Sequence, residues 1–117
     1  MAREKNKLAA LVTGASSGIG LEMARVLAEK GYDLILTARN RSKLTSLAKE
    51  LSALNVHCEV IPSDLSTPDG APALVQEIEK RGIGVGILIN NAGFGTFGPF
   101  VESDVQKQME IDRKSVV

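Results

Sequence analysis

The sequence predicts an α/β fold in which helices cover both faces of a parallel sheet. Segments with strand patterns alternate along the chain with segments that carry apolar residues at helical spacing. The expected strands are continuous apolar runs such as "DLILT", which are typical of strands buried on both faces. A glycine-rich turn, "TGASSGIG" at 13–20, joins the first strand to the first helix. Because crossovers between parallel strands are right-handed, we expect a doubly wound sheet.

Four strands and four helices are expected. The strands are predicted at Leu8–Val12, Asp33–Thr37, Val56–Ile61 and Gly84–Ile89. The helices are predicted at Ile19–Lys30, Arg41–Leu54, around 71–78, and from Val101 to the end. Their apolar faces are Ile19, Met23, Val26 and Leu27, then Leu44, Leu47, Leu51 and Leu54, then Ala71, Leu74, Val75 and Ile78. The last strand is apolar on both faces and no strand follows it, so we expect an incomplete sheet, the first part of a larger unit.

Length and composition indicate one domain over residues 1–117. The 14 basic and 14 acidic residues balance and form no basic block, so neither nucleic acid nor a membrane surface is an expected partner. No apolar run approaches the length of a membrane span. Cys58 is the only cysteine, which excludes an internal disulfide and favours a reducing compartment. We therefore expect a cytoplasmic protein.

The glycines of the turn, Gly14, Gly18 and Gly20, have the spacing G-x-x-x-G-x-G. Glycine permits a tight turn and positive φ, and its missing side chain lets a pyrophosphate approach the backbone. The start of the following helix offers free N–H groups to phosphates, and Ser16 and Ser17 add hydroxyl donors. A turn that needs glycine only for packing the helix on the strand would use the same residues, so the glycines alone leave both interpretations open.

Two further motifs follow later strands, "SDL" at 63–65 and "NNAG" at 90–93. Together with "TGASSGIG" they stand in the order and near the spacing of the short-chain dehydrogenase/reductase superfamily, which the chain resembles over essentially its whole length. The resemblance covers about the first half of a typical family domain. It implies a Rossmann fold and hydride transfer between NAD(P) and a carbonyl or alcohol substrate.

The resemblance also implies the residues that bind the cofactor. In the glycine turn these are Gly14, Ser16, Ser17, Gly18, Ile19 and Gly20. Asp64 is implied to bind the adenine amino group, with Leu65 beside it. The remaining residues are Asn90, Ala92 and Gly93, which would line the adenosine ribose, and Asn91, which would brace the sheet. The structural alternatives are turn formation around "SDLSTPDG" and a polar loop at "NNAG".

The end of the second strand, "LTARNR", bears on the choice of cofactor. Units that bind NAD place an acidic residue there for the ribose 2′-OH, whereas a nearby arginine accommodates the 2′-phosphate of NADP. Ala38 occupies the acidic position and Arg39 follows it. We therefore expect NADP(H) to be preferred over NAD(H), with Arg39 as the discriminating residue. The alternative is that Arg39 and Arg41 are solvated charges at a helix start.

No catalytic or metal-ligating residue is assigned. The resemblance implies a catalytic Ser, a Tyr-x-x-x-Lys pair and an Asn in the fourth helix, but Tyr32 is the only tyrosine and Leu36 stands four residues after it. "IDRKS" at 111–115 contains no Asn. His57 and Cys58 are too few for a metal site. The phenylalanines of the loop after the fourth strand are expected to line an apolar substrate pocket or to pin that loop. They are Phe94, Phe97 and Phe100.

The leading hypothesis is an NADPH-dependent oxidoreductase of the short-chain type, of which this chain carries the cofactor-binding half. The alternatives are a non-catalytic dinucleotide-binding fragment or interaction module, and a structural α/β domain that binds no nucleotide. A homo-oligomer is expected, since the resemblance implies association through helices that include the fourth and the apolar edge strand favours pairing.

Overall fold

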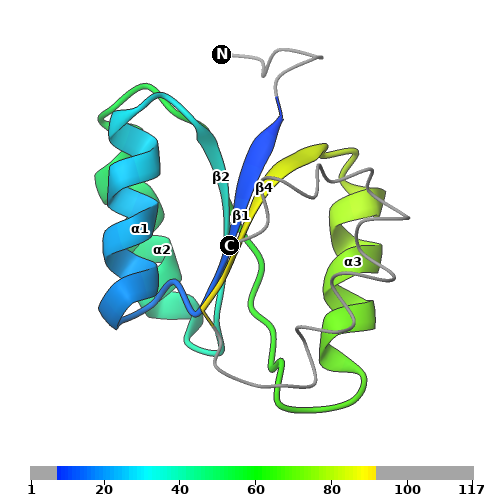
Figure 1. Ribbon diagram of the computed structural model, residues 1–117. Helices are drawn as coiled ribbons and strands as arrows, with labels where there is room; N and C mark the ends of the chain where they lie inside the picture. Colours follow the sequence, from blue (N-terminus) through cyan, green and yellow to red (C-terminus); the bar gives the residue numbers. More distant parts are fainter. Residues whose placement is uncertain (1–7, 92–117) are drawn as a thin grey trace.

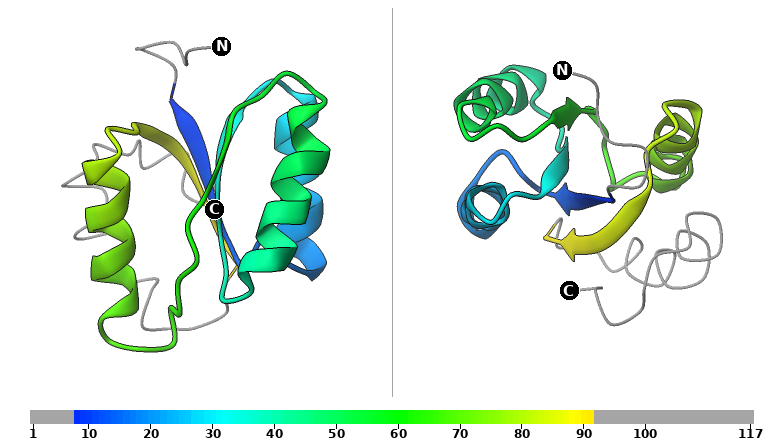
Figure 2. Two further views of the ribbon diagram at one scale, coloured as in Figure 1. Left: turned by 180° about the vertical axis from the view of Figure 1, so that it is seen from behind. Right: turned by 90° about the horizontal axis from the view of Figure 1, so that it is seen from above.

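The computed structural model describes residues 8–91, which form a three-layer α/β unit. The four strands are parallel and lie in the order β3-β2-β1-β4. The elements are β1 (Ala9–Thr13), α1 (Gly18–Glu29), β2 (Asp33–Thr37), α2 (Arg41–Ser52), β3 (Cys58–Val60), α3 (Gly70–Lys80) and β4 (Val85–Asn90). Figure 1 shows α1 and α2 on one face of the sheet and α3 on the other, and the view from above in Figure 2 separates the layers. The predicted doubly wound parallel sheet is therefore confirmed. The predicted fourth helix and the loop that carries the phenylalanines lie outside the described residues.

Two apolar cores result from the alternation of side chains along the strands. Leu11 of β1 belongs to the core on the α3 side, with Leu74 and Ile78 of that helix. Val12, the next residue, belongs to the core on the side of α1 and α2, with Leu44 of α2. All five residues of β1 and of β2 are buried, as continuous apolar runs predict for inner strands of a parallel sheet.

The structure corrects the predicted inner face of α1. Ile19 and Val26 are 70% and 43% exposed, although both were expected to face the core. Apart from Leu27, the buried residues of this helix are small: Gly20, Ala24 and Ala28. Small side chains let the helix lie close to the sheet, and this contact decides which side of an otherwise apolar helix is covered.

The predicted ranges of α2 and β3 were too long. α2 ends at Ser52, and Leu54 beyond it is 45% exposed, because Asn55 adopts a positive φ of 62° and turns the chain towards the next strand. β3 comprises only Cys58–Val60, which pair with Leu34–Leu36 of β2. Among the described strands β3 has a neighbour, β2, on one side only, so fewer of its residues are held in a ladder.

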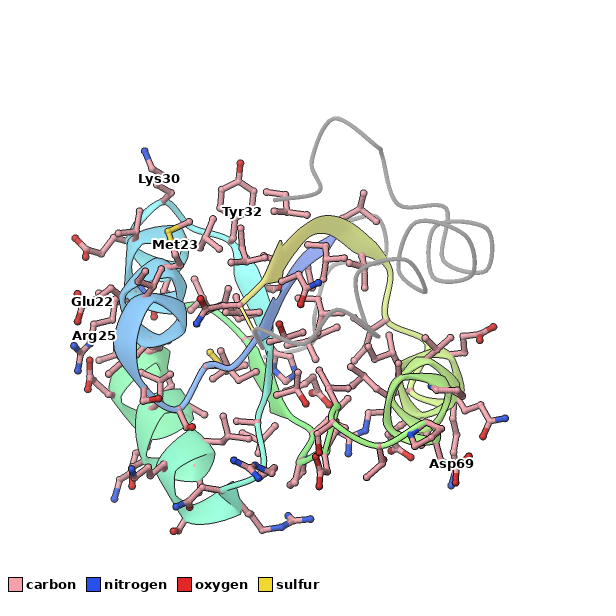
Figure 3. The ribbon with its side chains drawn as sticks, turned by 60° about the horizontal axis from the view of Figure 1, so that its bottom comes forward. Glu22, Met23, Arg25, Lys30, Tyr32 and Asp69 are labelled. Atoms are coloured by element: carbon pink, nitrogen blue, oxygen red, sulfur yellow. The ribbon has the colours of Figure 1, made fainter. Side chains whose placement is uncertain are left out.

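Ion pairs connect the outer elements. Arg25 of α1 donates from Nε to Glu50 of α2 at 2.8 Å and from Nη1 to Glu22 at 2.9 Å. Figure 3 shows Glu22 and Arg25 on the outer side of α1, away from the sheet. The Arg25–Glu50 pair joins α1 to α2, whereas Glu22 and Arg25 both belong to α1, and each exposed pair contributes little to the free energy of unfolding.

A second charged network covers the free edge of β3. Glu59 binds the imidazole of His57 and accepts a hydrogen bond from Nη1 of Arg81 at 2.9 Å. Nε of Arg81 donates to Glu77 of α3 at 2.7 Å, and its Nη1 also lies 3.4 Å from the carbonyl oxygen of Val60. Burial alone would raise the pKa of Glu59, but the bonds from His57 and Arg81 outweigh it and hold that pKa below its usual range.

We predict that Leu51→Ala lowers the free energy of unfolding much more than Leu54→Ala does. Leu51 is 1% exposed, so its truncation should cost about 2–5 kcal/mol, whereas the exposed Leu54 should cost below about 1 kcal/mol. Urea denaturation of the two variants against the unchanged chain measures both values. Equal losses would mean that Leu54 packs into the core as the longer helix required.

We predict that Glu59→Gln removes an acid-sensitive part of the stability. Because the pKa of Glu59 is lowered on folding, its contribution is present above the unfolded pKa of about 4.3 and is lost as pH falls through the folded value. The variant should lose up to about 1 kcal/mol at pH 7, and this loss should shrink as pH falls towards 3. Denaturation curves from pH 7 to 3 measure this, and a constant difference across that range would contradict it.

Candidate functional site

A cavity of about 290 Å³ opens at the carboxyl ends of β1, β2 and β3. Its lining residues come from the loops that follow these strands and β4: Gly14, Ser16, Ser17, Ala38, Arg39, Asn40, Ser63, Asp64, Leu65 and Asn91. In Figure 1 this edge of the sheet is the lower end, where α1 begins. Open α/β sheets bind ligands at this edge, beside the point where the strand order reverses, which is here between β1 and β4.

Glycine is required at the three positions of the turn for different structural reasons. A Cβ on Gly20 would lie 2.2 Å from the carbonyl oxygen of Gly14, and a Cβ on Gly14 would lie 2.8 Å from the carbonyl oxygen of Asn91. Packing inside the protein therefore demands these two glycines. Gly18 has a positive φ of 59°, but a Cβ there would meet nothing within 4 Å. The backbone at Gly18 is thus open to an approaching ligand.

Among residues 8–91, the start of α1 lacks a side-chain cap. Ser17 is the N-cap residue, but its side chain makes no capping hydrogen bond, and the first turn of the helix contains no acidic residue. In contrast, Asn40 caps α2 by accepting from the N–H of Lys43 at 3.1 Å. The first N–H groups of α1 and the positive end of its dipole are therefore available to an anion, and the exposed Gly18 leaves room for one.

One cation and one carboxylate of the cavity influence each other. Hydrogen bonds from the hydroxyl and N–H of Ser66 hold the pKa of Asp64 below its usual range, and the charge of Arg39 lowers it further. Asp64 and Arg39 are both exposed, so both are accessible to a ligand. Arg39 follows Ala38 at the end of β2, so the position directly before it carries no acidic side chain that would repel a phosphate.

The two asparagines at the end of β4 make different contacts with Thr13. Asn90 is the last residue of β4, and its Oδ1 accepts a hydrogen bond from the buried hydroxyl of Thr13 at 3.1 Å. The N–H of Asn91 donates to that same hydroxyl at 2.8 Å. Thr13 thus joins the end of β1 to the end of β4, and Asn91 reaches the cavity lining.

The structure brings seven of the predicted cofactor residues into this one cavity. They are Gly14, Ser16, Ser17, Arg39, Asp64, Leu65 and Asn91. Gly18, Ile19, Gly20 and Asn90 do not line it but adjoin residues that do, while Ala92 and Gly93 lie outside the described residues. Asn40 and Ser63 also line the cavity and were not predicted as site residues. The place of Asn40 before a helical pattern signalled an N-cap, and Ser63 stood in the "SDL" motif.

A second cavity of about 600 Å³ lies on the other side of the loop between β3 and α3. Ser63 and Asp64 line both cavities, and the second one contains Arg41 and Arg81. Asp64 therefore borders two cavities, one with Arg39 and the other with Arg41 and Arg81.

Tyr32 lies away from the cavity. It directly precedes β2, at the amino end of that strand, and is 37% exposed. Figure 3 shows Tyr32 beside Lys30 at the end of α1 opposite its open N-terminus. The chain's only tyrosine is therefore at the wrong edge of the sheet for chemistry at the cavity.

A strand–turn–helix unit with an open helix start, set at the switch point of a doubly wound sheet, defines a nucleotide-binding α/β protein. The model of the short-chain dehydrogenase family matches residues 8–117, so the chain belongs to this family.

Known relatives agree with that membership. The chain is 44% identical over 86 residues to a very-long-chain 3-oxoacyl-CoA reductase-like protein of Arabidopsis thaliana, with 72% of this chain and 27% of the relative covered. A short-chain dehydrogenase from Sphingobium yanoikuyae, solved with NADPH, has a TM-score of 0.66 and 40% identity over 74% of this chain and 34% of that one. An L-sorbose reductase from Gluconobacter frateurii, solved with NADPH and L-sorbose, has a TM-score of 0.70 and 37% identity, with 76% and 34% covered. The chain thus spans about a third of the length of these proteins.

Residues 8–91 contain neither a candidate membrane span nor a candidate metal site. None of the helices within residues 8–91 is long and apolar enough to cross a membrane. Those residues also contain no group of three His, Cys, Asp or Glu side chains that could hold a metal ion.

We predict unequal costs for alanine at the glycines of the turn. Gly20→Ala should destabilise the chain by about 3 kcal/mol, because its Cβ would meet backbone that cannot move without shifting α1. Gly18→Ala should cost about 1 kcal/mol, from its positive φ alone. Gly82→Ala is the matched control, since Gly82 also has a positive φ and open space but lies far from the cavity. Urea denaturation measures all three, and similar losses at 18 and 20 would contradict the packing argument.

Proposed function

We propose that this chain is the cofactor-binding part of an oxidoreductase that transfers hydride between NADP(H) and a carbonyl or alcohol substrate. The observation that carries the proposal is the single cavity shared by the open start of α1, Arg39 and Asp64. Membership of the short-chain dehydrogenase family supports the reaction class. When bound, the nicotinamide ring would supply the hydride chemistry, and the residues of this chain would hold the rest of the cofactor.

The proposed arrangement follows the chemistry of the lining residues. The pyrophosphate would lie at the N–H groups of the first turn of α1, near Gly18, because a helix start attracts anions and no side chain blocks this one. Ser16 and Ser17 would donate hydroxyl hydrogen bonds. Asp64 and Leu65 would contact adenine, and Asn90, Ala92 and Gly93 the adenosine ribose.

The preference for NADPH rests on Arg39. Its exposed guanidinium lies at the cavity after a strand that ends without an acid, and the delocalised charge of arginine suits a phosphate. An acidic residue at position 38 would repel a 2′-phosphate, but alanine stands there. Two solved relatives of similar sequence contain NADPH, which is consistent with this preference.

A second candidate function is cofactor binding without catalysis. The position of Tyr32 favours it, since the chain's only tyrosine lies at the opposite edge of the sheet from the cavity. An assay with NADPH and a panel of ketones tests the second candidate. Consumption of NADPH by this chain would contradict a binding module, whereas binding without consumption fits both candidates, because the residues assigned here bind the cofactor and none is assigned to catalysis.

Compartment and assembly belong to the same proposal. A cytoplasmic location remains our expectation from the single cysteine, and self-association is expected through β4, whose second edge pairs with no strand among the described residues. Light scattering over a concentration series tests the assembly, and a constant monomer mass would contradict it.

We predict that Arg39→Ala weakens NADPH binding about 10- to 100-fold, because a charge-assisted contact with the 2′-phosphate is lost. Binding of NADH, which has no 2′-phosphate, should stay unchanged. Isothermal titration calorimetry of the 117-residue chain with each cofactor gives both affinities.

The matched control is Lys30→Ala, which removes one positive charge at the far end of α1 (Figure 3). It should leave both affinities unchanged, since long-range charge effects are screened by salt. Equal affinity of the unchanged chain for NADH and NADPH, or a ratio that Arg39→Ala does not alter, would overturn the proposed cofactor preference.

A further inference from the structure

The loop between β3 and α3 fixes Asp64 from both sides. The N–H of Ser63 donates to the carbonyl oxygen of Ala38 at 2.9 Å, and its hydroxyl lies 2.7 Å from the hydroxyl of Thr37 at the end of β2. On the other side, the hydroxyl of Thr67 donates to the carbonyl oxygen of Asp64 at 3.1 Å. A Cβ on Gly70 would lie 1.9 Å from that same oxygen, so the loop backbone packs directly on the start of α3.

Ser66 acts on the side chain of Asp64 rather than on its backbone. Its N–H donates to Oδ1 at 3.0 Å, and its hydroxyl donates to the same oxygen at 2.5 Å. Within residues 8–91 no hydrogen bond reaches the other carboxylate oxygen, Oδ2. Two donors on one oxygen fix the rotation of a carboxylate and leave the second oxygen as an acceptor for a ligand.

The orientation of the Asp64 carboxylate decides in which of the two cavities it can bind a ligand. Asp64 lines both cavities, one with Arg39 and the other with Arg41 and Arg81. Asp64 and Arg39 line the same cavity, and the charge of Arg39 contributes to the lowered pKa of Asp64, so the carboxylate and the guanidinium lie close enough to interact. Loss of the Ser66 hydroxyl would leave Oδ1 with the N–H of residue 66 alone among these two donors, and the carboxylate would be held less firmly.

We propose that Ser66 is a positioning residue, which holds the Asp64 carboxylate toward the cavity of Arg39 and thereby sets selectivity for a base that carries an amino donor. The inference rests on the proposed function, in which Asp64 accepts a hydrogen bond from the adenine amino group. Ser66 itself does not line the cavity, so it acts only through Asp64.

The test compares NADPH with its hypoxanthine analogue, in which a carbonyl acceptor replaces the 6-amino donor while all phosphates are kept. In the unchanged chain, NADPH should bind about 10-fold more tightly than the analogue. Ser66→Ala should weaken NADPH about 3- to 10-fold and leave the analogue nearly unchanged. Ser66→Thr keeps the hydroxyl and should restore the selectivity.

A purely structural role gives a different result. If Ser66 only stabilises the loop, Ser66→Ala lowers both affinities equally or neither, and the proposal is overturned. An NMR titration of the Asp64 carboxyl without nucleotide is a second readout, because Ser66→Ala should raise its pKa and Ser66→Thr should not. An unchanged pKa would also overturn it.

The two proposals fail in different ways. The Arg39 test depends on the ratio of NADPH to NADH, whereas the Ser66 test depends on the ratio of two bases that carry the same phosphates. A chain that separates NADPH from NADH but not adenine from hypoxanthine retains the proposed function and loses this inference. A chain that binds no nucleotide loses both.

Discussion

The backbone contact between Gly20 and Gly14 is the constraint on which the site depends. With only hydrogen at Gly20, the first turn of α1 touches the carbonyl group of Gly14, and Gly14 touches the backbone of Asn91. The end of β1, the start of α1 and the residue after β4 therefore meet at these two glycines, where the side-chain amide of Asn91 also lies close. This contact brings the open end of α1 to the end of β1, beside the loops that carry Arg39 and Asp64. A larger residue at either glycine would move the helix and its dipole away from them.

Two threonines make the matching polar connections. Thr13 and Thr37 are the last residues of β1 and β2, are fully buried and pair with each other in the sheet register. The Thr13 hydroxyl holds the residues that end β4, and the Thr37 hydroxyl holds Ser63 after β3. A buried hydroxyl must find partners, and here the partners are the loops that shape the cavity. Hydrogen bonds therefore hold the backbone at the carboxyl ends of the strands, and polar residues line the cavity there.

The sequence predicted the parts of the fold that depend on local pattern. The bounds of β2, the start of α2 and the glycine stops Gly31 and Gly82 follow from apolar runs and positive φ. Periodicity could not show which side of α1 is covered, because Ile19 and Val26 compete with small residues that fit the sheet more closely. Parallel strands bring their carboxyl ends to one edge, so motifs after separate strands were expected to meet. The role of Ser66 depends on a carboxylate rotation that no spacing encodes.

The polar network at the edge of β3 affects where a further strand can join the sheet. Arg81 already contacts the outer carbonyl group of Val60, and the Glu59 carboxylate and the His57 imidazole lie at that edge, so polar side chains discourage another strand from pairing there. At β4 the described residues place no such barrier. A strand from a further segment or another molecule would therefore add beside β4, while Arg39 and Asp64 lie towards β2 and β3. Extension of the sheet and occupation of the adenosine end of the cavity need not compete for the same surface.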